Sequence, residues 1–176
     1  LKSIELEMKI YIDQQNIVQR MAQMTQKTNQ FNLTTTRYTE ADILGFVNGD
    51  DCNVFAFEVC DKFGDYGITG LSIIEKNLSK KTANIETLLM SCRVIGRNIE
   101  VAFFNLLVKQ MKDSGIKTLK AKYIKTMKNE QVSKFYDTMG FELVNGSESE
   151  KVYELELSKY KFHKINYIKL NLWKQG

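Results

Sequence analysis

The stretch of sequence that decides the fold is Ser91-Cys92-Arg93-Val94-Ile95-Gly96-Arg97-Asn98, where the hydrophobic period of the chain changes. Before it, three segments read as strands joined by short turns, which predicts an antiparallel meander over roughly 53–60, 67–75 and 82–92. After it, apolar residues from Asn98 to about Asp113 cover most of a helix surface. A helix that apolar is expected to be largely buried.

A turn from a strand into a buried helix can bind an anion. The first N–H groups of a helix have no partner inside it, and the helix dipole adds positive potential there. With Gly96 in the turn and Arg93 and Arg97 beside it, the stretch predicts a site for phosphate or pyrophosphate. The alternative is an ordinary turn that carries two solvated arginines.

The segment before the meander predicts one strand and two helices. Apolar and polar residues alternate from Ile4 to Ile12, as in a half-buried strand. Asp13 is expected to cap the helix that follows, and Thr39 with Asp42 resembles a capping box that opens a second helix.

The segment after the buried helix predicts a strand at 116–124, a helix from Asn129 to about Met139, and strands at 141–144 and 152–157. The element order is therefore β-α-α-β-β-β-α-β-α-β-β, in one α+β domain over residues 1–157. Residues 158–176 form a basic and aromatic tail, for which an edge strand and a partner-facing segment both fit.

Composition excludes several classes of protein. The chain has 176 residues, 43% of them hydrophobic, which suits one compact domain. It contains neither a long apolar span nor a secretory leader, and its three cysteines form no CxxC, so we expect a cytoplasmic protein without a membrane partner. A single histidine, His163, leaves no usual zinc site, so no metal is expected. The net charge of +4 is spread over many lysines, which argues against nucleic acid and allows an acidic protein partner.

The turn also resembles a known family motif. Arg93-x-x-Gly96-Arg97-Asn98 is similar to the Q/R-x-x-G-x-G/A loop of the GNAT acyltransferases, although Asn98 replaces the final small residue and is expected to cap the helix instead. The resemblance implies the GNAT fold, a mixed and mainly antiparallel sheet flanked by helices. It also implies that this loop binds the pyrophosphate of coenzyme A or the phosphopantetheine of a carrier protein, through Arg93, Val94, Ile95, Gly96, Arg97 and Asn98.

A second GNAT-like motif is Asn129-x-x-Val132-x-x-Phe135-Tyr136-x-x-x-Gly140-Phe141, which resembles the later helix of that fold. The tyrosine of this helix often acts as a general acid toward the leaving thiolate, so the resemblance implies that role for Tyr136. It also implies a part in cofactor binding for Asn129. For Tyr136, simple packing is the alternative.

A narrower likeness covers residues 4–157. The segments Thr28–Thr35, Phe63–Gly67 and Leu89–Arg97 together resemble the C-terminal half of FkbH-like proteins. In that family a HAD-type phosphatase half takes a phosphoglyceryl unit, and the enzyme delivers glyceryl to an acyl carrier protein for polyketide extender units. The resemblance implies both as partners, the phosphatase within a longer chain, because no Asp-x-Asp phosphatase motif is present here. A start at Leu1 also suggests a fragment.

Cys92 is the first catalytic candidate. We expect it to share a strand face with Glu86, Leu88 and Met90, and to ionise readily beside a helix start and two arginines. Thioester exchange onto Cys92 would split one acyl transfer into two steps, with Glu86 polarising a group on the same face. The alternative is a buried cysteine that only packs.

The acceptor side is expected in the polar stretch, where Asn29, Gln30 and Asn32 can hydrogen-bond a glyceryl hydroxyl or pantetheine amides. A loop satisfied by its own turns is the alternative. Asp65 is a candidate base or simply a turn residue. The favoured function is transfer of a short acyl group, glyceryl by resemblance, between thioesters. A coenzyme A-dependent N-acyltransferase and a non-catalytic carrier-protein docking module stay open.

Overall fold

The computed structural model describes residues 5–173, so Ile4 of the predicted first strand and residues 174–176 of the tail lie outside the described residues. The helices are α1 (Val18–Lys27), α2 (Glu40–Asn48), α3 (Ile99–Asp113) and α4 (Phe135–Thr138). The strands are β1 (Leu6–Ile12), β2 (Phe31–Asn32), β3 (Cys52–Asp61), β4 (Gly64–Asn77), β5 (Thr82–Met90), β6 (Thr118–Ile124), β7 (Glu142–Gly146), β8 (Glu150–Glu156) and β9 (Ile168–Trp173).

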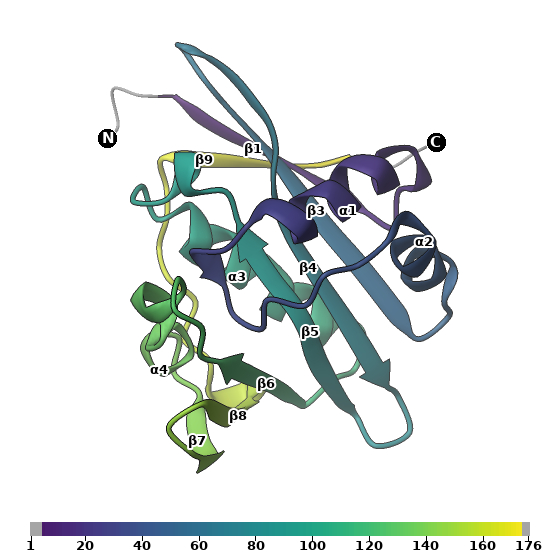
Figure 1. The fold of residues 1–176 in the computed structure, drawn as a ribbon, viewed down its shortest axis with the longest axis vertical. Helices are drawn as coiled ribbons and strands as arrows, with labels where there is room; N and C mark the ends of the chain where they lie inside the picture. Colours follow the sequence, from purple (N-terminus) through teal and green to yellow (C-terminus); the bar gives the residue numbers. More distant parts are fainter. Residues whose placement is uncertain (1–4, 174–176) are drawn as a thin grey trace.

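Within the described chain the strands form one mixed sheet in the order β7-β8-β6-β5-β4-β3-β1-β9, with β2 paired to β5 beside this path (Figure 1). Strands β3, β4 and β5 make the predicted antiparallel meander. Among the strands of residues 5–173 only two pairs are parallel, β5 with β6 and β1 with β9. The predicted α+β class and mainly antiparallel sheet are therefore confirmed.

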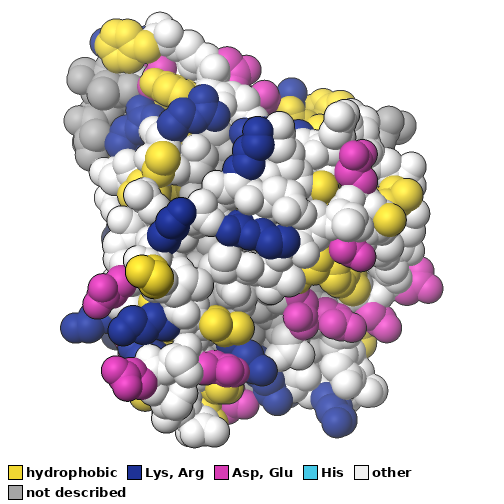
Figure 2. All heavy atoms as spheres, in the orientation of Figure 1, with side chains coloured by type: hydrophobic (Ala, Val, Ile, Leu, Met, Phe, Trp, Pro, Cys, Tyr) yellow, Lys and Arg dark blue, Asp and Glu magenta, His cyan; other side chains and the backbone are white. Residues whose placement is uncertain are grey.

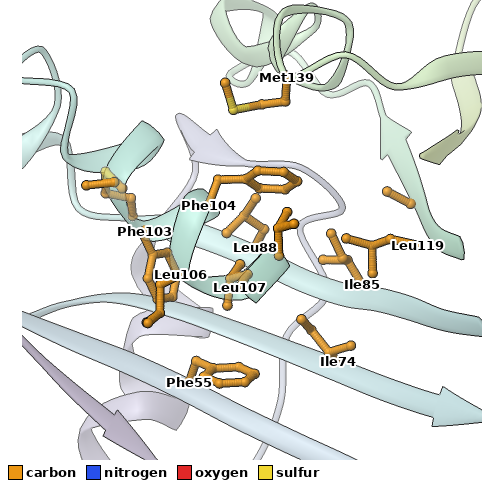
Figure 3. Packing of buried hydrophobic residues seen from close by; sticks show 14 of the residues in the cluster. Phe55, Ile74, Ile85, Leu88, Phe103, Phe104, Leu106, Leu107, Leu119 and Met139 are labelled. Carbon is orange, nitrogen blue, oxygen red and sulfur yellow. The ribbon is translucent and has the colours of Figure 1, made fainter. Parts of the chain in front are cut away.

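Helices cover both faces of the sheet. Helices α1 and α2 lie in front of it in Figure 1, over a cluster that includes Val18, Ile43 and Leu71. The larger cluster lies on the other face, where α3 and α4 pack (Figure 3). There Phe103, Phe104 and Leu107 of α3 meet buried side chains of the sheet, among them Phe55, Ile74, Ile85 and Leu88. Burying each such side chain contributes about 1.5–3 kcal/mol, which explains why α3 is apolar around most of its surface.

Two elements of the structure were not in the predicted order. The short strand β2 lies between α1 and α2 and pairs with the end of β5. Strand β9 lies in the C-terminal tail and pairs with β1 at the edge of the sheet. The predicted helix at 129–139 is broken into a 3-10 turn, Glu130–Val132, and the single turn of α4.

The two predicted helix starts have different outcomes. At α2 the capping box is confirmed, because the Thr39 hydroxyl accepts from the Asp42 amide and the Asp42 carboxylate accepts from the Thr39 amide. The prediction that Asp13 caps α1 is wrong. Its carboxylate accepts instead from the Val54 amide at 2.7 Å and from Asn53 at 2.8 Å, so it joins the end of β1 to β3.

Two glycines give opposite predictions for stability. A Cβ on Gly70 would lie 1.8 Å from Cε2 of the buried Phe57, so Gly70→Ala should destabilise the fold by about 2 kcal/mol or more. Gly45 lies on the exposed face of α2 with no atom within 4 Å of its Cβ position. Gly45→Ala should stabilise the fold by about 0.5–1 kcal/mol. Urea unfolding measures both, and equal effects from the two variants would contradict the close contact at Gly70.

Candidate functional site

The turn between β5 and α3 has a defined backbone. Strand β5 ends at Met90, and residues Cys92–Val94 form a 3-10 turn in which the Arg93 amide donates to the Ser91 hydroxyl. Gly96 follows with φ of +102°, a conformation that favours glycine, and α3 begins at Ile99. The predicted strand-to-helix turn is therefore present. It begins two residues earlier than the sequence indicated, because β5 ends at Met90 and not at residue 92.

Two side chains of this turn already have partners within the chain. Arg97 donates to Asp61 at 3.0 Å, and the Asp61 side chain is almost fully buried. Burial works to raise the pKa of the Asp61 carboxyl, but hydrogen bonds from Arg97 and the Phe63 amide hold it below its usual value. The prediction that the Asn98 side chain caps α3 is wrong, because it donates to the Tyr167 hydroxyl at 2.8 Å and makes no cap bond. Arg97 and Asn98 thus anchor the turn to the sheet and the tail.

A basic hollow lies beside the turn, between the end of β5, α1 and the segment after it. Its volume is about 760 Å³, and its lining includes Arg20, Lys27, Arg93 and Lys128, with no Asp or Glu among the described residues that form it. Figure 2, which views the molecule from the α1 side, shows separate Lys and Arg side chains over the upper and central parts of this face. We call this the basic hollow.

The two arginines of the basic hollow are held by neutral groups. Arg20 donates to the Ile68 carbonyl at 3.1 Å and to Gln23 at 2.8 Å. Arg93 donates to the Tyr66 carbonyl at 3.3 Å. Burial, with the neighbouring charge of Arg93, lowers the pKa of the Arg20 guanidinium. Within residues 5–173 neither guanidinium forms an ion pair, so the positive potential of Arg20 and Arg93 can attract an anion.

The prediction that Cys92 and Glu86 share a strand face is wrong. Ile74 pairs with Ile85 and Ile73 with Thr87, so Glu86 is the extra residue of a bulge and the side-chain alternation shifts there. Leu88 and Met90 then face the main core. Cys92 lies beyond the strand, exposed, in the lining of the basic hollow. The alternative of a buried, packing cysteine is excluded by this exposure.

Glu86 lines a separate groove of about 420 Å³, with Thr34, Lys120 and Lys122 also in its lining. Burial first, and then the neighbouring Glu75, raise the pKa of Glu86, while Lys122 opposes that shift. The groove and the basic hollow share no lining residue. We call the groove lined by Glu86 the Glu86 groove.

The predicted acceptor residues separate in space. Asn29 and Gln30 line the basic hollow together with Cys92 and Arg93, so the structure brings these four together. Asn32 is fully buried, and its side chain donates to the Thr28 carbonyl and accepts from the Thr35 amide. It is therefore not available to a substrate in this structure.

Asp65 is the second residue of β4, at the exposed end of the β3–β4 hairpin, where its carboxylate accepts from the Gly67 amide at 2.7 Å. That bond is the ordinary role of a turn aspartate. The placement supports the turn interpretation of Asp65 rather than a catalytic one.

Asn129 is fully buried and makes hydrogen bonds through both ends of its amide. Its Nδ2 donates to the carbonyls of Asn32 and Ile124, both at 2.9 Å. Its Oδ1 accepts from the Thr126 amide and the Tyr123 hydroxyl. In this structure the Asn129 side chain therefore joins β6 and the loop after it to β2, and its Nδ2 has no N–H donor left for a cofactor.

Tyr136 lies in an aromatic core. It is 1% exposed, with ring centroids 4.8 Å from Phe141 and 5.6 Å from Tyr153. Burial raises the pKa of its hydroxyl well above the usual value. Tyr136 lines neither the basic hollow nor the Glu86 groove, which supports the packing alternative.

Comparison with solved structures gives the fold. The ribosomal-protein-S18-alanine N-acetyltransferase from Escherichia coli superposes with a TM-score of 0.66 at 13% identity, over 90% of this chain and 99% of that one. The spermidine N-acetyltransferase from Vibrio cholerae gives 0.63 at 12% identity, over 89% and 96%. The PaiA N-acetyltransferase from Thermoplasma acidophilum, solved with coenzyme A, gives 0.56 at 17% identity, over 68% and 72%. The chain has the GNAT fold.

The GNAT fold prediction is thus confirmed, whereas nothing in the comparisons points to the FkbH-like proteins or to a HAD-type partner. No protein-family model matches the chain, and no curated protein matches it. Within residues 5–173 no group of three His, Cys, Asp or Glu is placed to hold a metal ion. In the same part of the chain, no helix is long and apolar enough to cross a membrane.

Three cations of the basic hollow were missed by the sequence analysis, namely Arg20, Lys27 and Lys128. Arg20 and Lys27 belong to α1, and Lys128 follows β6. Each is an ordinary surface cation in the sequence, and only the folded chain brings α1 and the loop after β6 beside Arg93. No local pattern identifies them.

The exposure of Cys92 gives a chemical prediction. Burial raises the pKa values of Cys52 and Cys60, which are both partly buried. Because alkylation requires an accessible thiolate, brief treatment with iodoacetamide at neutral pH should modify Cys92 first. Intact-protein mass should show one adduct that is absent from Cys92→Ala. A first adduct that persists in that variant would contradict the placement.

Proposed function

We propose that this GNAT-fold domain is an acyltransferase whose donor is a pantetheine thioester, with its phosphate held in the basic hollow. The observation that carries the proposal is the hollow itself, in which Arg20, Arg93, Lys27 and Lys128 face no carboxylate among the described residues. Guanidinium groups bind phosphate oxygens through paired, charge-assisted hydrogen bonds. The adjacent turn adds backbone N–H groups at the start of α3. Coenzyme A bound to one protein of the same fold supports this donor class.

In the first route the acyl group passes through Cys92. Its exposed thiol lies in the lining of the basic hollow, where a thioester carried by the bound donor would be within reach. The Cys92 thiolate adds to the thioester carbonyl, the carbon–sulfur bond to the donor breaks, and the departing thiolate takes a proton from water. The acyl-cysteine then passes the acyl group to an acceptor thiol by the reverse exchange.

In the second route the acceptor is an amine and Glu86 is the base. A carboxylate with a raised pKa is better matched to accepting a proton near neutral pH. Because Glu86 and Cys92 line different hollows, they do not act on the same reacting atom in this structure. Several proteins with this fold are N-acetyltransferases, which supports an amine acceptor.

The finer proposal concerns the acyl group and the partners. The motifs of Thr28–Thr35, Phe63–Gly67 and Leu89–Arg97 support glyceryl as the acyl group and an acyl carrier protein as its carrier. The same resemblance supports a HAD-type phosphatase within a longer chain. The free cysteines suit the reducing cytoplasm.

Donor binding tests the proposal. Arg93→Gln should weaken acetyl-coenzyme A binding at least tenfold in calorimetry, because it removes one guanidinium from the basic hollow. The matched control is Lys109→Gln, which removes an exposed cation of α3 that pairs with Asp113 instead of lining the hollow. Absence of binding by the native chain to both acetyl-coenzyme A and an acylated carrier protein would overturn the acyltransferase proposal and the docking module alike. Binding of the carrier protein without any acyl transfer would leave the docking module.

The two routes make opposite predictions for two variants. On the cysteine route, a glyceryl-pantetheine thioester should add one acyl mass to the native chain and none to Cys92→Ala. On the amine route, Glu86→Gln should lower amine acylation by about 100-fold or more. The native rate should rise as pH increases through the raised pKa of Glu86, since only the carboxylate accepts a proton, and this rise should vanish in Glu86→Gln. An unchanged rate and pH profile in Glu86→Gln would exclude Glu86 as the base.

A further inference from the structure

The residue immediately before α3 has an unusual conformation. Asn98 has φ of +60° and ψ of 21°, which places its backbone in the left-handed region. A residue at this position usually has extended backbone angles, from which an asparagine side chain accepts a hydrogen bond from an amide of the first helical turn. The Asn98 side chain makes no such bond. What holds Asn98 in this conformation lies outside the helix.

The hydroxyl of Tyr167, in the C-terminal tail, bonds Asn98 and the residue before it. It accepts from Nδ2 of Asn98 at 2.8 Å and donates to the Arg97 carbonyl at 3.4 Å. The Arg97 carbonyl belongs to the peptide group that joins Arg97 to Asn98. One hydroxyl therefore holds both the side chain of Asn98 and the peptide that precedes it, and together these bonds favour the left-handed conformation.

The tail is fixed on either side of Tyr167. Before it, the Tyr160 hydroxyl donates to Oδ1 of Asn105 at 2.7 Å, and Nδ2 of Asn105 donates to the His163 carbonyl at 2.8 Å, so the tail is bonded to α3. After it, β9 begins at the buried Ile168, which pairs with the first residue of β1 (Figure 1). The Tyr167 side chain itself packs against the main core. The position of its hydroxyl is therefore set by the packing of the whole tail.

The diversion of the Asn98 side chain leaves the start of α3 without a cap from that residue. The first N–H groups of a helix have no acceptor inside it, and they carry the positive end of the helix dipole. Arg97 is already paired with the buried Asp61. The turn therefore offers an anion the guanidinium of Arg93 and these backbone amides.

We propose that Tyr167 is a positioning residue for the donor phosphate. Because it holds Asn98 in the left-handed conformation, the Asn98 side chain does not cap α3, and the first amides of the helix stay open to the phosphate. The inference rests on the proposed function, in which the phosphate lies in the basic hollow beside this turn. Without the Tyr167 hydroxyl, Asn98 returns to extended angles, and its Oδ1 accepts from the amides that the phosphate would otherwise use.

Donor binding tests the role of the hydroxyl. Tyr167→Phe should weaken acetyl-coenzyme A binding by about three- to tenfold in calorimetry, because one neutral hydrogen bond then no longer favours the open turn. The matched control is Tyr160→Phe, which removes the hydroxyl of another tail tyrosine, bonded about two turns further along α3 at Asn105. It should lower the free energy of unfolding and leave the affinity unchanged. Equal affinities of the native chain and Tyr167→Phe would overturn the proposal.

A second variant tests whether Tyr167 acts through Asn98. Asn98→Gly has no side chain that could cap α3, and glycine adopts the left-handed conformation without support. In this background Tyr167→Phe should no longer change the affinity for acetyl-coenzyme A, because the competing cap cannot form. The same loss of affinity in both backgrounds would mean that Tyr167 only supports the tail, and the proposal would be wrong.

Amide hydrogen exchange tests the cap without any donor. In Tyr167→Phe the amides of Glu100 and Val101 should exchange several-fold more slowly than in the native chain, since the Asn98 side chain then accepts from one of them. Unchanged or faster exchange at both amides would overturn the proposal. A native chain that binds neither acetyl-coenzyme A nor an acylated carrier protein would overturn the proposed function, whereas slower exchange in Tyr167→Phe would still support control of the Asn98 cap by Tyr167.

Discussion

The parallel pairing of β5 and β6 ends at Ile85 and Ala121, while both strands continue. Buried backbone N–H and C=O groups must be paired, so the opening between the two strands has to be filled by protein or ligand. In this chain residues 31–34 fill it, and much of the site follows from that requirement. Asn129 is committed to the Asn32 carbonyl, Phe31 and Leu33 complete the core above α3, and two hollows remain at the ends of the segment.

The arginines near the turn before α3 fall into two groups, one paired within the chain and the other lining the basic hollow. Arg97 pairs with the buried Asp61, and Asn98 with Tyr167, so the turn before α3 is fastened to β3 and to the tail. Arg93 lines instead the basic hollow, where burial first, and then the nearby charge of Arg93, lower the pKa of Arg20. Two guanidinium groups held near each other by neutral acceptors repel one another, and a bound anion would reduce that repulsion.

Much of the fold could be predicted because its signals are local. The alternation in β1, the Thr39 and Asp42 capping box, and the change of period at Ser91–Asn98 are each readable within a few residues. The candidate site was harder to predict from the sequence. Cys92, Arg93, Asn29 and Gln30 do meet in one hollow, but the supposed common face of Cys92 and Glu86 fails because a bulge at Glu86 shifts the alternation. A bulge adds one residue to a strand, so the alternation changes phase at Glu86, and the continuous apolar run Leu88-Leu89-Met90 that follows hides this change in the sequence.

The sequence by itself determined the order of the elements apart from β2 and β9, the buried character of α3 and the turn with Gly96 before that helix, because hydrophobic period and turn chemistry act over short distances. The tertiary structure alone decided which cations meet, which amides are already paired and what lies between β5 and β6. Those properties join residues far apart in the chain, such as Arg20 with Arg93 and Asn32 with Asn129. No local pattern encodes them, because each arises only when the whole sheet and its helices have packed together.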